Sequence, residues 1–551
     1  MARIPRRRFM KQAGIAGIGF AGDLWLGRAP MAQERSSPVT RVVIDPSFQV
    51  SDLDPRVFGS FLEQLGRAIY TGIYEPGSKL SDSNGFRTDV MKEIHDLGVP
   101  IVRWPGGNFV SGYHWLDGVG PQKDRPRVLD RAWNTLETNQ FGTNEFMTWC
   151  KQTGTEPLMG LNFGTGSAEM AAALVEYCNV DKGTRWSDLR RQHGYQEPHN
   201  VKYWCLGNEM DGPWQIGHMS AHEYGEKAAD AARQMRVIDP SLKLIACGSS
   251  GPFMPTFLEW DRQVLEECYN EVDGISLHRY FGNAEETGGD SSHYLAMNLA
   301  MDRQIEQISA VADMVGGLKR SNKQLWLSFD EWNVWYRARG PAADNGHRTE
   351  APHLLEEVYN LEDALLVGGL INSLLRHADR VKLACLAQLV NVIAPLMTNE
   401  TGVLRQTIYY PYLWGLHNAR GTVLRLAPEG PTYEVARLGR PIEAGGTVMA
   451  GLGQVPYLDV AATFDAAGKT LTLLVLNRDL EKPRELAVEW RGITPTKVTS
   501  AQVITGSDLK ATNTFDNPKN VVPQTLETPA AGSSMSLQLP AHSHSLVTFS
   551  V

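Results

Sequence analysis

Two short motifs in this chain each carry a glutamate where an apolar run ends. Glu209 lies in WCLGNEMDGPW, residues 204–214, and Glu331 lies in LSFDEWNVW, residues 327–335. Two acids held at the ends of different strands are the arrangement that sugar hydrolysis needs, with one proton donor and one nucleophile. The tryptophans beside them offer flat apolar faces to sugar rings. The motifs therefore predict a glycosidase site if the fold brings the two glutamates together.

The two glutamates would need different surroundings. A general acid near neutral pH has a pKa raised by burial or by a nearby negative charge, and Glu331 would supply that charge to Glu209. In a retaining mechanism the second carboxylate attacks the anomeric carbon, and the two carboxyl groups lie about 5 Å apart. The alternative is that one glutamate only caps a helix or forms a structural ion pair.

Asp330 competes with Glu331 for the second role. Neighbouring residues in a strand face opposite ways, so we expect only one of the two to look into the same space as Glu209. This alternation does not choose between them, and both stay open on spacing alone.

The composition is that of an ordinary globular protein. At 551 residues the chain exceeds the size at which a single core stops growing, so we expect two domains. Its 42% hydrophobic and 21% charged residues are typical of soluble chains. The net charge of −9 argues against nucleic acid as a partner.

Between about residues 55 and 390, short apolar runs alternate with longer segments of helical period. No G-x-G-x-x-G turn follows the first run, which weakens a dinucleotide-binding sheet. Eight strand–helix alternations are typical of a closed parallel (β/α)8 TIM barrel, in which chemistry gathers at the carboxyl ends of the strands. The eight runs are 57–62, 99–103, 157–161, 201–206, 242–247, 274–277, 324–329 and 381–386.

After about residue 410 the helical period disappears, and stretches of alternating apolar and polar residues lie between turn residues. This pattern predicts an α/β barrel followed by an all-β domain, a C-terminal antiparallel, jelly-roll-like β-sandwich. We place the barrel at residues 53–405 and the sandwich at residues 406–551. The segment 33–52 has the same strand character and is expected to pair with the sandwich.

The first residues resemble a twin-arginine signal. Arg6-Arg7-Arg8-Phe9-Met10-Lys11 matches that pattern, and a weakly apolar stretch follows. We therefore expect residues 1–32 to be a signal peptide and the protein to be periplasmic or secreted. None of the six cysteines forms a C-x-x-C pair, so we expect no disulfide framework and no zinc site.

Seven ordered blocks resemble the α-L-arabinofuranosidases of glycoside hydrolase family 51. The blocks are GSFLEQLGRAIYTGIYEP (59–76), RWPGGNFVSGYHW (103–115), TNQFGTNEF (138–146), NEMDGPWQ (208–215), GISLHRYFGN (274–283), DEWNVW (330–335) and AQLVNVIAP (387–395). They cover the barrel almost end to end. In the superfamily that the resemblance implies, the acid/base and the nucleophile end strands four and seven. The fourth and seventh runs counted above lead to Glu209 and Glu331.

The resemblance implies that Glu209 is the acid/base, that Glu331 is the nucleophile, and that Asn208 bonds the sugar 2-hydroxyl as the transition state forms. It also implies further residues around the furanose and at the entrance of the site: Glu63, Asn108, Tyr280, Gln388, Trp133 and Trp335.

Several of these residues have a second interpretation. Asn108 could simply occupy the turn of PGGN, and Gln388 could satisfy buried backbone groups. His278, two residues before Tyr280, could be a core histidine bonded to a carboxylate or a direct sugar contact.

We therefore expect a retaining exo-glycosidase that releases terminal α-L-arabinofuranosyl residues from arabinoxylan, arabinan or their oligosaccharides. We expect no metal and no organic cofactor, and no membrane partner after processing. The resemblance implies a homo-oligomer, with a hexamer expected. The alternatives are an endo-β-1,4-glucanase or xylanase of the same family, and an inactive carbohydrate-binding barrel.

Overall fold

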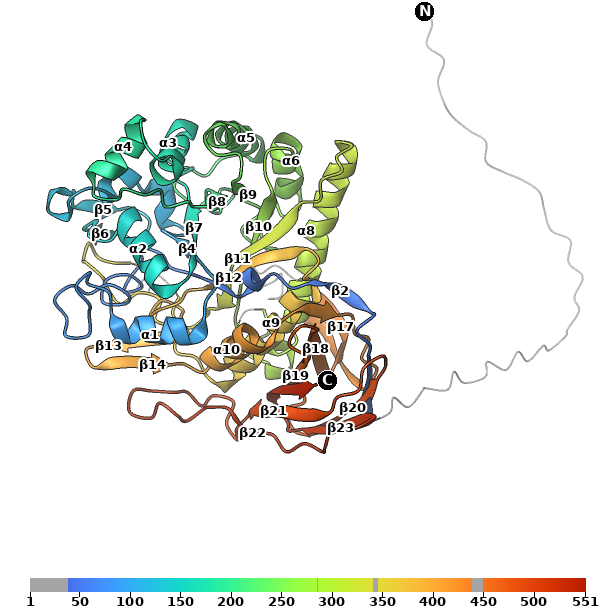
Figure 1. Cartoon of the computed structure of the whole chain (residues 1–551). Coiled ribbons are helices and arrows are strands. Elements are labelled where there is room, and N and C mark those ends of the chain that lie inside the picture. Colours follow the sequence, from blue (N-terminus) through green and yellow to red (C-terminus); the bar gives the residue numbers. More distant parts are fainter. Residues whose placement is uncertain (1–37, 285, 340–344, 439–448) are drawn as a thin grey trace, which may run out of the picture. The chain divides into compact units, whose positions relative to one another are not determined.

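The computed structural model describes residues 38–284, 286–339, 345–438 and 449–551. Within these residues eight parallel strands close into a barrel in the order β10, β11, β12, β3, β4, β7, β8, β9 (Figure 1). The strands are β3 (Gly59–Phe61), β4 (Ile101–Trp104), β7 (Glu156–Gly160), β8 (Tyr203–Leu206), β9 (Lys243–Ala246), β10 (Gly274–Phe281), β11 (Trp326–Val334) and β12 (Val381–Ala387). The predicted barrel is confirmed, with one strand at each of the eight runs. The expected signal peptide, residues 1–32, lies outside the described residues.

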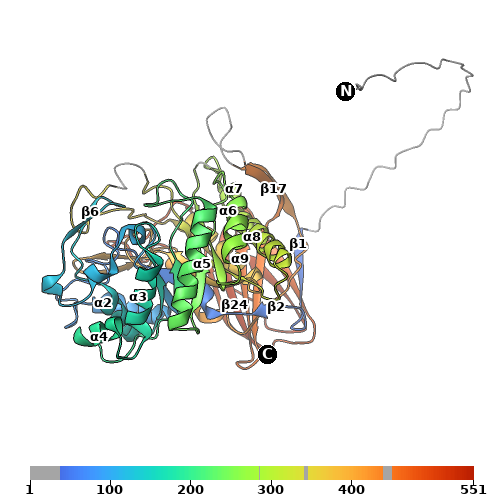
Figure 2. The ribbon, with the colours of Figure 1, turned by 90° about the horizontal axis from the view of Figure 1, so that it is seen from above.

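Helices connect the barrel strands and cover the barrel. Figure 2 shows α5, α6 and α8 side by side. A glycine in the left-handed region closes two of the helices, with φ 68° at Gly98 and 74° at Gly154, as is common at helix ends. The helices of this part are α1 (Thr88–Leu97), α2 (Thr143–Thr153), α3 (Ala168–Asn179), α4 (Arg185–Gln192), α5 (Ala221–Ile238), α6 (Glu259–Cys268), α7 (Ser291–Tyr294), α8 (Asn298–Leu318) and α9 (Leu361–Arg376).

Two barrel strands run further than their apolar runs predicted. β10 ends at Phe281 and β11 at Val334, four and five residues beyond the predicted ends. The added residues include His278 and Glu331, which stand opposite each other across the two strands. Their polar side chains contact one another inside the barrel, with 3.7 Å between Nδ1 and Oε2. A polar residue therefore does not end a strand here, because it finds a partner on the next strand.

After the barrel the chain forms a domain rich in strands. One sheet has the order β2, β15, β18, β19, β24, β21, β22, and another has the order β1, β20, β23. Val475 and Phe549 of the first sheet share one apolar core with Val488 and Leu537 of the second, as in two sheets packed face to face. The strands are β1 (Val39–Ile44), β2 (Gln49–Asp52), β15 (Thr422–Leu424), β18 (Leu458–Asp465), β19 (Thr470–Asn477), β20 (Arg484–Trp490), β21 (Lys497–Ile504), β22 (Gln524–Thr525), β23 (Ser534–Leu539) and β24 (Ser543–Ser550).

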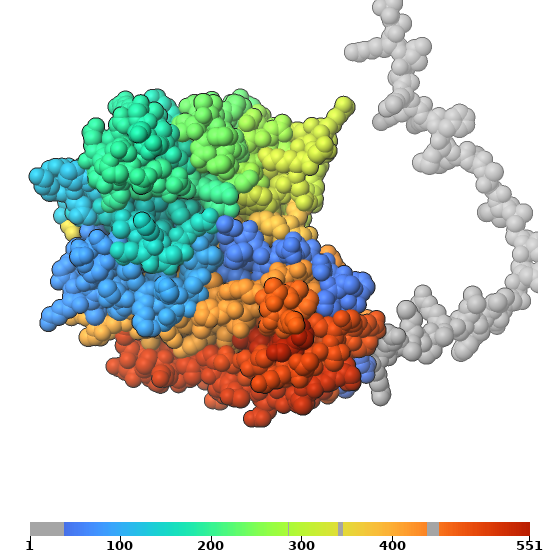
Figure 3. All heavy atoms as spheres, in the orientation of Figure 1, coloured from blue at the N-terminus to red at the C-terminus, as the bar shows by residue number. Residues whose placement is uncertain are grey.

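The first described strands pair with this domain. β1 runs parallel to β20, from Val39 opposite Glu485 to Ile44 opposite Trp490, whereas β2 is antiparallel to β15. In Figure 3 the blue surface of this early segment adjoins the orange and red surface of the later strands. One ladder is thus parallel in a domain predicted to be antiparallel, because no short hairpin fixes the direction of a strand that comes from far away in the chain. The domain boundaries at 53 and 406 stay predictions.

Helix α9 is the main contact between the barrel and the strand-rich domain. It packs against β18, β19 and β24. At the same interface Asp459 of β18 accepts hydrogen bonds from Arg376 at 3.0 Å, from Arg478 at 2.5 Å and from Asn298 at 2.9 Å. These charges are paired and hydrogen-bonded, and the contacts offset the desolvation cost of burying them. The interface therefore combines close packing with fixed polar contacts.

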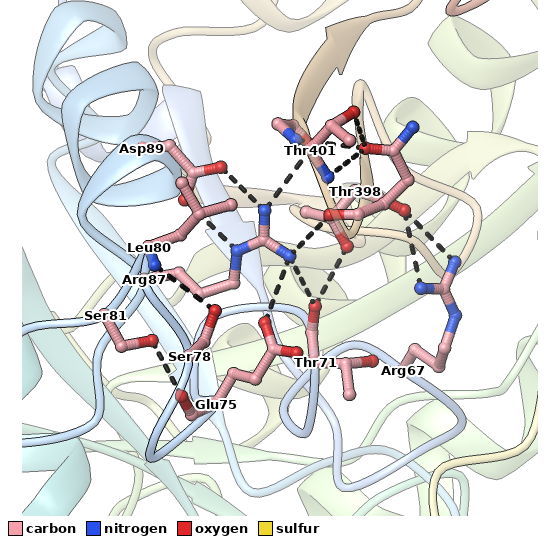
Figure 4. A network of polar contacts seen from close by, with 12 residues as sticks. Arg67, Thr71, Glu75, Ser78, Leu80, Ser81, Arg87, Asp89, Thr398 and Thr401 are labelled. Atoms are coloured by element: carbon pink, nitrogen blue, oxygen red, sulfur yellow. Dashed lines mark hydrogen bonds and ion pairs between the residues drawn. The ribbon is translucent and has the colours of Figure 1, made fainter.

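A buried arginine fixes the long segment between β3 and α1. Arg87 is 1% exposed and donates to the Asp89 carboxylate at 2.6 Å and to the carbonyl oxygens of Asn399 at 3.0 Å and Thr71 at 3.3 Å (Figure 4). Asn399 ends β13 (Leu396–Asn399), which forms a hairpin with β14 (Gly402–Arg405). The guanidinium therefore joins the segment that follows β3 to the hairpin that follows β12, at the two neighbouring strands where the barrel closes.

The cysteines lie in the packed interior. All six are free and buried, where a thiol behaves as a small apolar side chain. Among the described residues we find no helix with the length and apolar character needed to cross a membrane.

We expect Gly368→Ala to lower the free energy of unfolding by about 1–3 kcal/mol, the usual cost of overpacking. Gly368 lies in α9, and a Cβ there would stand 2.6 Å from Nδ1 of the buried His544 ring. Gly317→Ala in α8 is the matched control, because a Cβ there has nothing within 4 Å, and a gain of up to about 1 kcal/mol is expected. Urea unfolding measures both variants, and equal midpoints would contradict the close packing.

Candidate active site

Glu209 follows β8 in a turn with unusual backbone conformations. Gly207 has φ 100°, and Glu209 itself has φ 45°, in the left-handed region. A residue with a side chain costs roughly 1–2 kcal/mol in that region, and such costs gather at functional sites. The carbonyl oxygen of Glu209 accepts the N–H of Gly212 at 2.8 Å, which closes the turn. The strained backbone conformation therefore falls on Glu209, the glutamate that the sequence predicts to be functional.

Glu209 and Glu331 meet at the carboxyl end of the barrel. One carboxylate oxygen of each and a ring nitrogen of His278 all lie within 4.8 Å of one another. The side chains of Glu209 and Glu331 are 12% and 6% exposed, so both are largely shielded from solvent while each keeps some accessible surface. A separation near 5 Å is typical of retaining glycosidases, whereas inverting enzymes leave roughly 6.5–9.5 Å for a water. The pair has the spacing of a double displacement.

Glu331 is fixed by two donors. The Arg103 guanidinium donates to its Oε1 at 2.6 Å, and the Tyr280 hydroxyl donates to its Oε2 at 2.8 Å. Arg103 comes from β4 and Tyr280 from β10, so three strands hold one carboxylate. A cation and a phenol at these distances stabilise a negative charge and fix its direction.

His278 joins the acids of the site. Its Nδ1 lies 3.0 Å from Glu209 Oε1, and its Nε2 lies 2.9 Å from Asp330 Oδ1. Burial by itself lowers the pKa of this imidazole, but the charge of Glu331 and the hydrogen bonds to Asp330 and Glu209 raise it to about 10. His278 is therefore a cation near neutral pH that donates from both ring nitrogens. It contacts carboxylates, as the core-histidine interpretation expected.

Asp330 and Glu331 both turn inward, so the strict alternation expected of them does not hold. The register of β11 against β12 shifts between Phe329 and Trp332, and this irregularity lets neighbouring side chains reach the same histidine. Asp330 contacts Nε2 of His278, and Glu331 approaches Nδ1, the nitrogen that bonds Glu209. The aspartate thus lies on the far side of the ring from Glu209. Its pKa is lowered despite burial, because Arg103 and His278 stabilise its charge.

Glu209 has the electrostatic setting of an acid. Burial raises the pKa of its carboxyl group, the charge of Glu331 adds to this shift, and the His278 hydrogen bond opposes it. The indole N–H of Trp214 donates to Oε2 at 2.7 Å. Trp214 is 48% exposed, so the acid lies beside an aromatic face that is open to solvent.

Asn208 is held between two side chains. Its Oδ1 accepts from Arg103 at 2.7 Å, and its Nδ2 donates to Gln215 Oε1 at 3.3 Å. Gln215 in turn donates to the Ser111 hydroxyl. The amide is therefore oriented from both ends beside Glu209.

Glu63 is a further buried carboxylate of the site, positioned from three sides. Its Oε1 accepts the Phe109 amide at 2.8 Å and the Trp133 indole at 2.9 Å, and its own N–H donates to Gln388 Oε1 at 2.9 Å. Burial raises the pKa of Glu63 to about 8, although both hydrogen bonds oppose the shift. Glu63, Trp133 and Gln388 therefore form one cluster, in which Gln388 serves a buried backbone group as its alternative interpretation expected.

The two remaining predicted residues lie on either side of this centre. Trp335 packs edge-on against Tyr280 with ring centroids 5.2 Å apart. Asn108 precedes the short helix at Phe109–Gly112 with φ −63°, so it does not occupy the left-handed turn that its alternative interpretation expected.

Sequence reasoning did not predict the contacts that Arg103, Asp330 and Trp214 make in the site, although Asp330 and the tryptophans of the motifs had been considered for other roles. Arg103 bonds Glu331 and Asn208, Asp330 bonds His278, and Trp214 bonds Glu209. The signal for Arg103 was a charged residue inside the apolar run IVRW, since a buried arginine needs acidic partners. Nothing in the spacing separates Trp214 from an ordinary surface tryptophan.

Glu209, His278 and Glu331 are also the described residues that could hold a metal ion, by their spacing. A histidine ligand must be neutral with a free ring nitrogen, whereas the pKa of His278 is raised to about 10 and both nitrogens face carboxylates. The cluster is held together without a metal, and the expectation of a metal-free site stays a prediction.

A (β/α)8 barrel with two buried glutamates at this spacing defines a retaining glycoside hydrolase. Two family models match the chain, the α-L-arabinofuranosidase 1 domain at residues 93–297 and the α-L-arabinofuranosidase C-terminal domain at residues 330–543. The chain belongs to the α-L-arabinofuranosidases of glycoside hydrolase family 51, as the sequence blocks predicted.

Individual relatives with high similarity to this chain are also named α-L-arabinofuranosidases. The chain is 47% identical over 484 residues to the intracellular exo-α-(1→5)-L-arabinofuranosidase 1 of Bacillus subtilis, covering 88% of this chain and 93% of that protein. It is 42% identical to an exo-α-(1→6)-L-arabinofuranosidase of Bifidobacterium longum, covering 88% and 91%. The solved structure of a family 51 α-L-arabinofuranosidase from Bifidobacterium longum superposes with a TM-score of 0.86 and 38% identity, covering 93% of this chain and 100% of that one.

The expected location is wrong. Five of the relatives that match along most of this chain are named intracellular, which contradicts the expectation of a periplasmic or secreted protein. The twin-arginine interpretation rested on residues 6–11, which lie outside the described residues.

We expect the stability of the protein to fall as the pH rises from about 6.5 to about 10. The unfolded imidazole has a pKa near 6.5, and folding raises the pKa of His278 to about 10. A raised pKa contributes stability that is complete below the unfolded value and is lost as the pH passes through the folded value. Urea unfolding should show a weaker fall for His278→Gln than for the parent. His222→Gln, at a histidine whose side chain is 61% exposed, is the control; parallel profiles for the parent and His278→Gln would refute the linkage.

Proposed function

We propose that this enzyme releases terminal α-L-arabinofuranosyl residues by double displacement, with Glu209 as acid/base and Glu331 as nucleophile. One observation carries the proposal. One oxygen of each carboxylate lies within 4.8 Å of the other, yet Glu331 is bonded by a guanidinium and a phenol, while burial raises the pKa of Glu209. When two neighbouring carboxyl groups have such different surroundings, the one whose pKa is raised is assigned as the proton donor and the other as the nucleophile.

In the first step a Glu331 oxygen attacks the anomeric carbon as the glycosidic bond breaks, and Glu209 gives its proton to the departing oxygen. In the second step Glu209, now a carboxylate, takes a proton from water, and the water oxygen displaces Glu331 from the sugar. Tyr280 and Arg103 keep Glu331 aimed through both steps. His278 donates to Glu209 at 3.0 Å and stabilises the carboxylate left by the first step.

The other predicted residues complete the pocket in this proposal. Asn208, oriented by Arg103 and Gln215, is placed beside Glu209 to bond the sugar 2-hydroxyl. Hydroxyl contacts are also proposed for Glu63, Asn108 and Gln388, while Trp133 and Trp335 line the entrance. These residues offer the carboxylate, amide and aromatic groups that a hydroxyl-rich ring needs.

We propose arabinan and arabino-oligosaccharides with α-(1→5) linkages as the first substrates, because several relatives carry that linkage in their names and one carries α-(1→6). Arabinoxylan is a further candidate. The endo-glucanase or xylanase alternative is not favoured, since a solved bifunctional glucanase–xylanase and a solved family 44 endoglucanase are only 13% and 11% identical to this chain and share only the fold. A homo-oligomer, with a hexamer expected, stays a prediction.

The nucleophile can be identified by trapping. A mechanism-based α-L-arabinofuranosyl inhibitor should label the peptide that holds Glu331, and Glu331→Gln should abolish both labelling and turnover. Asp330→Asn is the matched control next in the chain: it should still be labelled, because Asp330 lies on the far side of His278. Mass spectrometry of digested protein reads the result, and a label on Asp330 would overturn the assignment.

The acid can be identified by its dependence on the leaving group. Glu209→Ala should lose about 10²–10⁴-fold in kcat/KM on an α-1,5-linked oligosaccharide, the range for general acid catalysis. It should form the glycosyl-enzyme normally from a dinitrophenyl arabinofuranoside, whose leaving group needs no proton. Equal losses on both substrates would show that Glu209 is not the acid.

Substrate and stereochemistry can be read together. A panel of α-(1→5), α-(1→3) and α-(1→2) arabino-oligosaccharides, followed by NMR, should give fastest release from the α-(1→5) compound and the α anomer of arabinose first. The β anomer as first product would contradict retention, and preference for an internal bond of a long arabinan would contradict exo action.

A further inference from the structure

The turn that carries Trp335 is held by one buried carboxylate away from the reacting pair. Glu357 is fully buried. Its Oε2 accepts the Ala338 N–H at 2.7 Å, and its Oε1 accepts the Arg337 N–H at 3.1 Å. Oε1 also accepts Nη1 of the Arg337 guanidinium at 2.8 Å. One carboxylate thus binds two successive backbone amides and one cation of the same turn.

Ala338 links Glu357 to the indole of Trp335. Its N–H is bonded to Glu357, and its carbonyl oxygen accepts Nε1–H of Trp335 at 2.7 Å. The backbone N–H of Trp335 donates to Phe281 at 2.8 Å, which fixes the start of the turn on β10. Trp335 is therefore oriented at its backbone by a strand and at its ring by a turn that Glu357 shapes.

Trp335 leads directly to the reacting pair. Its ring stands edge-on to Tyr280 at 5.2 Å, and the Tyr280 hydroxyl donates to Glu331 at 2.8 Å. In this chain of contacts Glu357 and Glu331 are buried, and Ala338, Trp335 and Tyr280 are half-buried. A shift of the turn would move the indole along the side of the pocket without breaking a bond to Glu331.

We propose that Glu357 is a positioning residue that sets substrate affinity by fixing Trp335 beside Tyr280. It touches neither substrate nor the reacting atoms. It acts through the Ala338 peptide and the Trp335 ring, so it affects the binding of the sugar and not the cleavage of the glycosidic bond. This inference rests on the proposed function.

Glu362 provides the comparison. It is as deeply buried as Glu357 and lies five residues further along. Its oxygens accept from Asn283 at 2.6 Å, from Ser291 at 2.5 Å and from Lys510 at 2.7 Å, none of which belongs to the Trp335 turn. A general need for buried charge in this region would affect both glutamates alike.

The test replaces each glutamate by its isosteric amide in the full chain. Glu357→Gln places an NH2 group against the donors of the turn, so we expect KM for an α-1,5-linked arabinotriose to rise about tenfold, with kcat changed less than about threefold. Glu362→Gln should leave both constants within about twofold of the parent. Equal effects of the two variants, or a loss in kcat at constant KM, would overturn the proposal. An inactive parent enzyme would instead refute the proposed function.

A double-mutant cycle shows whether the effect runs through the indole. If it does, Glu357→Gln made in the Trp335→Ala background should change KM by less than about twofold, because coupled residues are not additive. A full tenfold effect in that background would show that Glu357 acts by another route.

Arg337→Lys keeps the proposal testable if Glu357→Gln does not fold. Arg337 bonds Glu357 with one arm and Asp363 with the other, at 2.6 Å. A lysine keeps the charge but reaches only one of the two carboxylates. KM should rise in the parent and not in the Trp335→Ala background, and a rise in both would overturn the proposal.

Discussion

The site depends on a balance of buried charges at the carboxyl end of the barrel. Arg103 and His278 are cations, and Asp330 and Glu331 are the anions that they contact. Glu209 is a third carboxylate that contacts His278, and burial together with the charge of Glu331 raises its pKa. In a low-dielectric interior each of these interactions is strong. Burial and the neighbouring negative charge therefore favour the protonated form of Glu209, as an acid/base requires.

These charges compensate one another only because side chains from different strands approach closely. The loop after β4 must leave space for that approach. A Cβ on Gly107 would lie 3.1 Å from Glu331 Oε1 and 3.2 Å from Glu63 Oε2, and one on Gly106 would lie 2.6 Å from Glu63 Cγ. Neither glycine has a positive φ, so it is space and not backbone conformation that excludes a side chain. The two glycines of PGGN are therefore explained by packing, because the carboxylates of Glu63 and Glu331 lie against this loop.

The barrel and its two acids could be predicted from sequence because both follow from local patterns. Each barrel strand is covered on both sides and reads as a short apolar run, and parallel strands end on one face, so the counting of runs placed Glu209 and Glu331 together. Strand ends were less predictable, because His278 and Glu331 satisfy each other across β10 and β11 and so continue both strands. The inward turn of Asp330 depends on a register shift, which no alternation of residue types reveals. The predicted export failed for a different reason, since a short terminal motif is independent of the fold.

The strand-rich domain acts on the site through α9, although it contributes none of the contacts to the reacting pair described above. The middle of this helix packs on His544 through Gly368. Its first turn carries Asp363, which binds Arg337 of the Trp335 turn at 2.6 Å. Burial raises the pKa of Asp363 to about 7, and the nearby guanidinium opposes the shift, so the ion pair holds only while the helix end stays in place. A helix packed against a second sheet cannot slide without opening that interface. The domain therefore stabilises the Trp335 turn by fixing the helix that binds Arg337.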